Sequence, residues 1–325
     1  MVAMHRRRFL VQCAVASAAW RLPAHAQPAR VARVGALHLG IADAESFQRE
    51  LRAGMRELGY EEGRNIAFEF RSAEEKLERL PELAADLVRR KVDVIVALYV
   101  PCALAAKQAT RDIPIVILAG DPVETGIVPS LARQGVNITG LSLMAARSNG
   151  KSVELFRDML PSARRVGVLA HATNPVYAKA MLDEVMRAGG QSRTEIHPVA
   201  MVRGPDDLEA AFANFTKERA DALVVQGSLS IRPVTDLAVK HRLPAASTAR
   251  AFAEIGGLMA FGADGPTSVR QSAKFVQRIL QGARPQDLPI EQPTKYELAL
   301  NLATARARGV PIRDSFLQRA DLLIS

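Results

Sequence analysis

Short runs of valine, isoleucine and leucine recur along the chain, and each is followed by an amphipathic stretch of helical length. The first five runs occupy residues 31–37, 65–70, 92–98, 113–119 and 136–143. A strand that is apolar at nearly every position is buried on both faces, and such strands alternating with helices form parallel sheets. The pattern therefore predicts an α/β fold in which helices cover both faces of a sheet.

The same pattern starts again after residue 150. A helical segment leads to apolar runs at 164–170 and 221–227, which again alternate with helical segments. Two successive α/β units predict two lobes, each a doubly wound parallel sheet. Because ligands bind at the carboxyl ends of parallel strands, two facing lobes are expected to form a cleft at those ends.

The N-terminus has the order of an export signal. Arg6–Arg8 precede the mostly apolar run Phe9–Trp20, which is too short to span a membrane, and the small residues Ala24 and Ala26 follow. We expect cleavage before Gln27 and a periplasmic product, by either the general secretory or the twin-arginine route. The removed segment holds four arginines and no acids, so the formal net charge falls from +9 to +5. No long basic block remains, and the sequence predicts no nucleic-acid partner.

Motifs for catalysis and for cofactor binding are missing from the sequence. The segment SNGKS at 148–152 imitates the end of a phosphate-binding loop, but Ala145 stands where that loop requires a glycine. No G-x-S-x-G motif occurs, the six histidines show no close-spaced pair, and Cys102 lies in an apolar segment where a packed thiol is expected. The sequence therefore predicts no catalytic residue, no metal site and no cofactor.

Aromatic and polar side chains follow the predicted strands in both units, where a ligand is expected. They bring aromatic faces, hydroxyls, an amide and charges of both signs to one cleft, which suits a small polar or zwitterionic solute. Each also has a simpler interpretation as a loop residue or a helix cap, above all Asn174 and Ser228. The candidate ligand-binding residues are His38, Tyr99, Val100, Pro101, Asp121, Asn174, Tyr177, Ser228, Arg250 and Glu254.

Two of these candidates, Tyr99 and Tyr177, follow equivalent strands in the two units. If the solute has a ring, we expect the two tyrosines to sandwich it, because the chain after the signal contains no tryptophan. The charged ends of the solute are expected at the remaining candidates, with a carboxylate held by Arg250 or Asn174 and an amine by Asp121 or Glu254.

Several segments of the chain resemble one protein family. They are ELGYEEGRNIAFEFR, LPELAADLVRRKVDVIVA, IPIVILAGDPVETGIVPSLARQGVNITG, EIGGLMAFG and QPTKYELALNLATARARGV, together with RRRFL and AHAQ near the N-terminus. The family is that of the ABC-transporter substrate-binding proteins, in its broad tryptophan/tyrosine-type group with the type I periplasmic binding fold. The resemblance spans nearly the whole mature chain. It implies two lobes that close on a small organic solute and dock to an inner-membrane ABC permease, and we expect a monomer.

The resemblance also implies three hinge strands between the lobes. Together with the strand-like segment GLMAFG and the helix that follows it, this predicts crossings near residues 143, 260 and 289. The expected domains are the signal peptide at 1–26, lobe one at 27–143 plus 261–288, and lobe two at 144–260 plus 289–325.

One loop departs from the family pattern. After the third strand the family usually has small or hydroxyl-bearing residues, whereas this chain reads LYVPCA. Tyr99 is able to stack on a ring or to donate its phenol, but the loop has no serine or threonine to hold a carboxylate. This departure weakens a direct assignment of an amino acid as the solute.

The leading functional hypothesis is a non-catalytic, exported solute-binding protein that closes around its ligand. An alternative is a periplasmic sensor that presents its closed form to a membrane receptor. An exported α/β enzyme is disfavoured by the missing motifs. Repressors with the same fold are disfavoured because the chain begins with an export signal in place of a helix-turn-helix.

Overall fold

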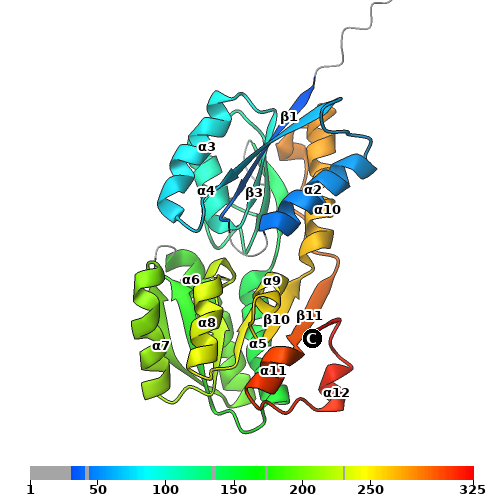
Figure 1. Ribbon diagram of the computed structural model, residues 1–325. Coiled ribbons are helices and arrows are strands. Elements are labelled where there is room, and N and C mark those ends of the chain that lie inside the picture. Colours follow the sequence, from blue (N-terminus) through cyan, green and yellow to red (C-terminus); the bar gives the residue numbers. More distant parts are fainter. Residues whose placement is uncertain (1–30, 41–43, 133–136, 173–174, 230) are drawn as a thin grey trace, which may run out of the picture. The chain divides into compact units, whose positions relative to one another are not determined.

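The computed structural model describes residues 31–40, 44–132, 137–172, 175–229 and 231–325, and the predicted export signal lies outside these ranges. Residues 32–325 form one compact unit. Its strands build two sheets, one formed by the first five strands and one by the last seven (Figure 1). The predicted α/β class with two parallel-sheet lobes is confirmed.

The first sheet has the strand order β2-β1-β3-β4-β5, and all its strands are parallel. Helices cover both of its faces: α3 and α4 lie on one, and α2 and α10 on the other (Figure 1). The strands are β1 (Ala32–His38), β2 (Ile66–Ser72), β3 (Val94–Leu98), β4 (Ile115–Ala119) and β5 (Ile138–Ser142). The helices are α2 (Ala44–Glu57), α3 (Leu80–Arg89), α4 (Val100–Ala109) and α10 (Gly265–Leu280).

Strand β3 shows why its sequence is apolar at every position. Val94 and Val96 pack in the cluster that contains Phe47 of α2 and Phe275 of α10. Ile95, between the two valines, faces the other side of the sheet and belongs to the cluster that contains α3 and α4. Because successive side chains of a strand alternate between faces, both faces of this strand are buried.

The second sheet has the order β12-β11-β10-β9-β8-β6-β7. Its pairs are parallel except β10 with β11, which is antiparallel and which the sequence pattern did not indicate. The strands are β6 (Arg165–His171), β7 (Glu195–Val202), β8 (Ala222–Val225), β9 (Ala245–Ser247), β10 (Met259–Ala263), β11 (Tyr296–Asn301) and β12 (Leu322–Ile324). The helices that follow or precede them are α5 (Ala145–Met159), α6 (Pro175–Ser192), α7 (Leu208–Lys217), α8 (Arg232–Lys240), α9 (Arg250–Glu254), α11 (Leu302–Ala307) and α12 (Asp314–Leu317).

The chain passes from elements of one sheet to elements of the other three times. Strand β5 of the first sheet leads to α5, which packs against α6 and β10. Strand β10 of the second sheet leads to α10, which packs against α2 at a close approach where a Cβ on Gly54 would lie 3.0 Å from that of Ala273. The chain then pairs at Glu291 with Leu141 of β5 before β11 joins the second sheet.

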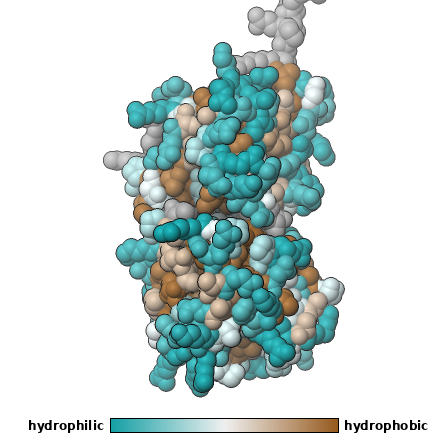
Figure 2. Space-filling view, turned by 60° about the vertical axis from the view of Figure 1, so that its left-hand side comes forward, coloured by the Kyte–Doolittle hydropathy of each residue, from teal (hydrophilic) through white to brown (hydrophobic). Residues whose placement is uncertain are grey.

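Large apolar side chains are mostly withdrawn from the surface. In the view of Figure 2, hydrophilic residues cover most of the face and hydrophobic residues emerge only in small separate groups. Across the helices of the described ranges, none combines the length and the apolar character needed to cross a membrane.

Gly140 in β5 is a position where only glycine fits. Its φ is +131°, and a Cβ there would overlap the backbone oxygen of Ile117. We expect Gly140→Ala to lower the free energy of unfolding by about 2–5 kcal/mol, because strain and overpacking act together. Chemical denaturation of the two proteins measures the difference.

The matched control is Gly190→Ala in helix α6. In the described part of the chain, no atom lies within 4 Å of the place where a Cβ on Gly190 would be. Since alanine has the higher helix propensity, this variant is expected to be unchanged or more stable by up to about 1 kcal/mol. Equal stabilities for the two variants would contradict the interpretation of Gly140.

Candidate ligand-binding site

A cavity of about 330 Å³ lies where the carboxyl ends of strands from both sheets come together. From the first sheet, Tyr99 follows β3 and Gly120 follows β4. From the second sheet, Gln226 follows β8 and Thr248 follows β9. The cavity therefore lies at the strand ends where doubly wound folds place their ligands.

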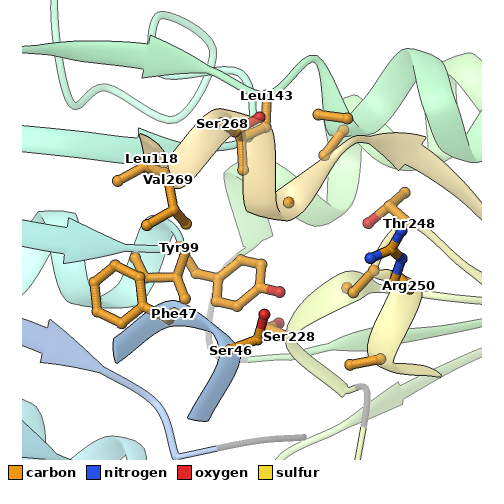
Figure 3. Close-up of a pocket in the computed structure, with 18 of the residues that line it drawn as sticks. Ser46, Phe47, Tyr99, Leu118, Leu143, Ser228, Thr248, Arg250, Ser268 and Val269 are labelled. Atoms are coloured by element: carbon orange, nitrogen blue, oxygen red, sulfur yellow. The ribbon is translucent and has the colours of Figure 1, made fainter. Parts of the chain in front are cut away.

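The first-sheet side of the cavity contains a large apolar surface. Phe47 from α2, Leu118 from β4 and Val269 from α10 form part of its wall. Figure 3 shows the Tyr99 ring extending from this side across the cavity towards the side of Ser228. Apolar side chains with a projecting phenol suit the ring of a small organic molecule.

The backbone at Tyr99 is strained. Its φ of 72° and ψ of 161° fall in a region that is essentially reserved for glycine. The residue stands at the N-cap of α4, and Val100 and Pro101 form the first helical positions and also line the cavity. The ring comes within 4.0 Å of the place where a Cβ on Gly227 would lie, so it meets a loop of the second sheet. Strain of this kind is concentrated at ligand-binding sites, where it aims a side chain.

The second-sheet side of the cavity carries hydrogen-bonding groups. Gln226, Ser228, Thr248 and Arg250 all contribute to this wall. The Gln226 amide accepts a hydrogen bond from the backbone N–H of His171 at 2.9 Å and donates one to the Ser228 hydroxyl at 2.9 Å. Figure 3 shows Thr248 and Arg250 on the side of the cavity away from Phe47. Glu45, Ser46 and Arg49 of α2 line the first-sheet side, so both sides carry polar groups.

The charge of Arg250 is already compensated by the protein. Its Nε donates to Glu297 of β11 at 2.7 Å, and its Nη2 donates to the second oxygen of the same carboxylate. The hydrogen bonds from this buried glutamate raise the pKa of Arg250 above its usual range. Next to this pair, Lys295 forms an ion pair with Asp264 at 2.8 Å. Arg250 thus offers donors to the cavity without an unbalanced positive charge.

Tyr177 forms a buried part of the wall. Its side chain is 4% exposed, and its hydroxyl lies 3.4 Å from the amide nitrogen of Asn149. Burial, together with the nearby negative charge of Asp121, raises the pKa of this phenol well above its usual range. The ring packs against Gly120, where a Cβ would lie 3.2 Å from it. Tyr177 is therefore a closely packed part of the cavity wall.

Most of the residues predicted from the sequence line this one cavity. Asn174 lies outside the described residues, and His38 and Asp121 are not part of the wall. The candidates that the structure brings together are Tyr99, Val100, Pro101, Tyr177, Ser228, Arg250 and Glu254.

Asp121 turns towards a helix. One of its carboxylate oxygens accepts a hydrogen bond of 2.7 Å from the backbone N–H of Ala146 in the first turn of α5. A helix N-terminus favours a negative charge at this place. Burial raises the pKa of Asp121, and the bond from Ala146 opposes that effect. The residue links the end of β4 to a helix of the second sheet.

His38 lies behind the cavity wall. It is 2% exposed, and its ring packs edge-on against that of Phe47, with 5.9 Å between the centroids. Its Nε2 lies 3.1 Å from the amide nitrogen of Gln48, and its Nδ1 is buried without a hydrogen-bond partner among the described residues. Burial lowers the pKa of His38 to about 4, so the ring is neutral near pH 7.

Several residues of the cavity wall are not among the candidates predicted from the sequence. Ser46 and Phe47 belong to the first turns of α2, and Pro266 and Ser268 to those of α10. The same strand-end rule that found Tyr99 also applies after β1 and β10, so the signal was present in the sequence. The sequence pattern did not give the exact residue at which each strand ends, and the rule depends on that residue.

No group of histidine, cysteine or acidic side chains within the described part of the chain is arranged to hold a metal ion. Cys102 is fully buried in α4, as predicted for a packed thiol.

Residues 44–324 match the family described as ABC transporter substrate binding protein. A protein described as a tyrosine-binding protein, from Clostridioides difficile (strain R20291), is 27% identical over 266 residues. The match covers 78% of this chain and 73% of that protein.

Solved structures resemble the chain over most of its length. A conserved domain protein from Vibrio cholerae O1 biovar El Tor is 25% identical with a TM-score of 0.82, covering 90% of this chain and 100% of that one. A domain from Streptococcus pneumoniae in complex with L-Trp has the same TM-score and coverage at 22% identity. A leucine-binding protein from Thermotoga maritima matches at TM-score 0.55 and 15% identity, covering 78% of this chain and 77% of that one. The fold is thus that of the type I periplasmic binding proteins.

The free energy of unfolding is expected to decrease as the pH is lowered, because of His38. The unfolded histidine takes up a proton near pH 6.5, whereas the folded one does so near 4, so acid favours the unfolded chain between these values. For this residue the loss between pH 7 and pH 5 is about 2 kcal/mol. Denaturation curves of the wild type and of His38→Gln at both values give the measurement, and the variant should lose less stability.

His171, whose pKa is also lowered by burial, acts in the same direction, so part of the pH dependence should remain in the variant. A variant at residue 38 with an unchanged pH dependence would contradict the assignment.

Proposed function

Because the chain belongs to the family of ABC transporter substrate-binding proteins, we propose that it captures a small ring-bearing solute in this cavity and delivers it to an ABC permease. The role is non-catalytic. Binding draws the two sheets together around the solute, and the closed form is the one that the permease recognises.

The two-sided cavity is the observation that carries this proposal. Phe47, Tyr99 and Val269 offer apolar surface on one side, and Ser228 and Arg250 offer hydrogen-bond donors on the other. Pockets of a few hundred cubic ångströms with an apolar lining and a few placed polar groups are typical small-molecule sites. A solute with a ring at one end and a polar group at the other matches both sides.

The ligands of related proteins agree with a ring-bearing solute. The relative from Clostridioides difficile is described as tyrosine-binding, and the Streptococcus structure contains L-Trp. Tyr99 lines this cavity and its ring projects into it, which supports the proposal that such a ring stacks on it. The identity of the ring and of the polar end is set by the residues of this chain.

The three passages between the sheets support the predicted lobes as hinge-linked domains. We assign 27–143 with 261–288 to one lobe and 144–260 with 289–325 to the other. The packing of α10 on α2 and of α5 on α6 supports this division. A monomer with two such lobes is sufficient to enclose one solute.

Export to the periplasm fits delivery to an inner-membrane permease. The sequence predicts cleavage before Gln27, and the protein isolated from its host is expected to begin at that residue. Intact-mass spectrometry gives the answer directly. A chain that retains Met1 in the cytoplasm would rule out the exported role.

A thermal-shift screen of the mature protein against amino acids, aromatic acids and purines tests the function. A solute present at 100 times its dissociation constant adds about 2.7 kcal/mol to the free energy of unfolding. Tyr99→Ala is expected to cost the best solute about 1–3 kcal/mol of binding, or roughly 5- to 150-fold in affinity, because it removes an aromatic surface.

Tyr99→Phe is the matched control, since it keeps the ring and removes only the hydroxyl. Calorimetry should find it closer to the wild type than Tyr99→Ala. If no solute stabilises the wild type, the proposed function fails. If a solute binds and both variants keep wild-type affinity, the assignment of Tyr99 fails and the function stands.

A further inference from the structure

The loop after strand β4 of the first sheet packs closely against two helices of the second-sheet lobe. A Cβ on Gly120 would lie 2.9 Å from the Cβ of Ala145, the first residue of α5. It would also lie 3.2 Å from the ring of Tyr177 in α6. Both distances are shorter than an ordinary contact between carbon atoms. Glycine at position 120 therefore permits a close approach of the two lobes beside the cavity.

The next residue, Asp121, caps helix α5 from the other lobe. Met144, at the N-cap of α5, has a left-handed backbone, and its side chain makes no capping hydrogen bond to any described residue. In its place the Asp121 carboxylate, 25 positions earlier in the sequence, accepts the bond of 2.7 Å from the N–H of Ala146. Such an acceptor satisfies one of the N–H groups that a helix leaves free at its start, where negative charge is also favoured.

The loop itself holds Asp121 in this direction. The carbonyl oxygen of Asp121 accepts hydrogen bonds from the backbone N–H of Thr125 at 3.0 Å and from the Thr125 hydroxyl at 2.9 Å. The residue is 8% exposed, and its φ of +48° is one that aspartate adopts more readily than most residues. The capping group is thus fixed on the first sheet, whereas the helix that it caps belongs to the second-sheet lobe.

We propose that Gly120 and Asp121 form a closing contact: their packing and capping of α5 are made only when the lobes come together, and they stabilise the closed form. Helix α5 begins directly after the chain passes from the first sheet to the second. Rotation of the second lobe about this passage therefore moves the N–H of Ala146 relative to the end of β4. A displacement of about 1 Å is enough to break a hydrogen bond of this length.

The inference rests on the proposed closure around a solute and identifies residues that set its equilibrium. Asp121 is not part of the cavity wall, so its effect on a solute would act through the closed form alone. Apparent affinity falls in proportion to the fraction of binding-competent protein. Loss of the contact is therefore expected to change the separation of the lobes and the affinity together.

Distance measurements by electron paramagnetic resonance test the contact without a solute. Spin labels at Glu78→Cys and Asp206→Cys of the mature protein report the separation of the lobes, because both residues are exposed and follow the edge strands β2 and β7, away from β5. Cys102 is fully buried and stays unlabelled. Asp121→Ala should lower the ratio of short-distance to long-distance molecules by about 2- to 30-fold, the equivalent of a lost helix cap.

Calorimetry measures the second consequence. L-Tyrosine and L-tryptophan, the amino acids named for related proteins, serve as probes. Asp121→Ala is expected to weaken the probe that the wild type binds by about 2- to 30-fold. The matched control is Asn301→Ala, which removes the cap that Thr304 binds at 2.8 Å at the start of α11, within one lobe. This control should lose stability and keep the wild-type distances and affinity.

A steric pair of variants tests Gly120 independently. Gly120→Ala is expected to shift the labelled protein towards the longer distance, because the new Cβ overlaps that of Ala145. Adding Ala145→Gly removes the overlapping atom and should restore part of the short-distance population. A Gly120→Ala variant that had merely misfolded would not be rescued in this way.

An unchanged distance distribution in Asp121→Ala, with a loss of stability like that of Asn301→Ala, would show an ordinary helix cap and overturn the inference. If Asp121→Ala does not fold, the distances in Gly120→Ala with and without Ala145→Gly give the answer. If no solute binds the wild type, the proposed function fails, and the distance measurements still decide whether the contact holds the lobes together.

Discussion

The packing of α10 against α2 constrains the whole molecule. One face of the first sheet is covered by these two helices, and the ion pair between Arg270 and Glu50 joins residues 220 positions apart in the sequence. Helix α10 follows β6–β10 in the sequence, so the covering of this face is completed by a segment that comes after most of the second sheet. Three segments of the chain therefore connect the two sheets. The carboxyl ends of strands from both sheets face a common cavity.

The first sheet was predictable because burial on both faces leaves a strong pattern. Strand β3 is apolar at every position, and helices that flank such strands leave little choice of fold. The reversed direction of β11 was not predictable in the same way. The connection between β10 and β11 is long and contains α10. The sequence therefore has no short hairpin turn that would indicate an antiparallel pair.

The site was predictable as a region and less so as a set of side chains. The strand-end rule led to Tyr99, Tyr177 and Arg250, which all line the cavity. It also selected Asp121, whose backbone has a φ of +48° and whose carboxylate reaches the N-terminus of α5. The direction of a side chain just after a strand depends on one or two dihedral angles, and the sequence does not reveal them.

The strained backbone of Tyr99 affects how the protein tolerates substitutions at this position. A glycine at this position would relax the strained dihedral angles, which cost about 1–3 kcal/mol, but it would remove the ring from the cavity. The relief of strain competes with the loss of packing, because Tyr99 packs against the hydrophobic clusters on both faces of the first sheet. One side chain thus combines a strained backbone, a packing contact and part of the cavity wall, so a substitution at this position changes stability and solute capture together.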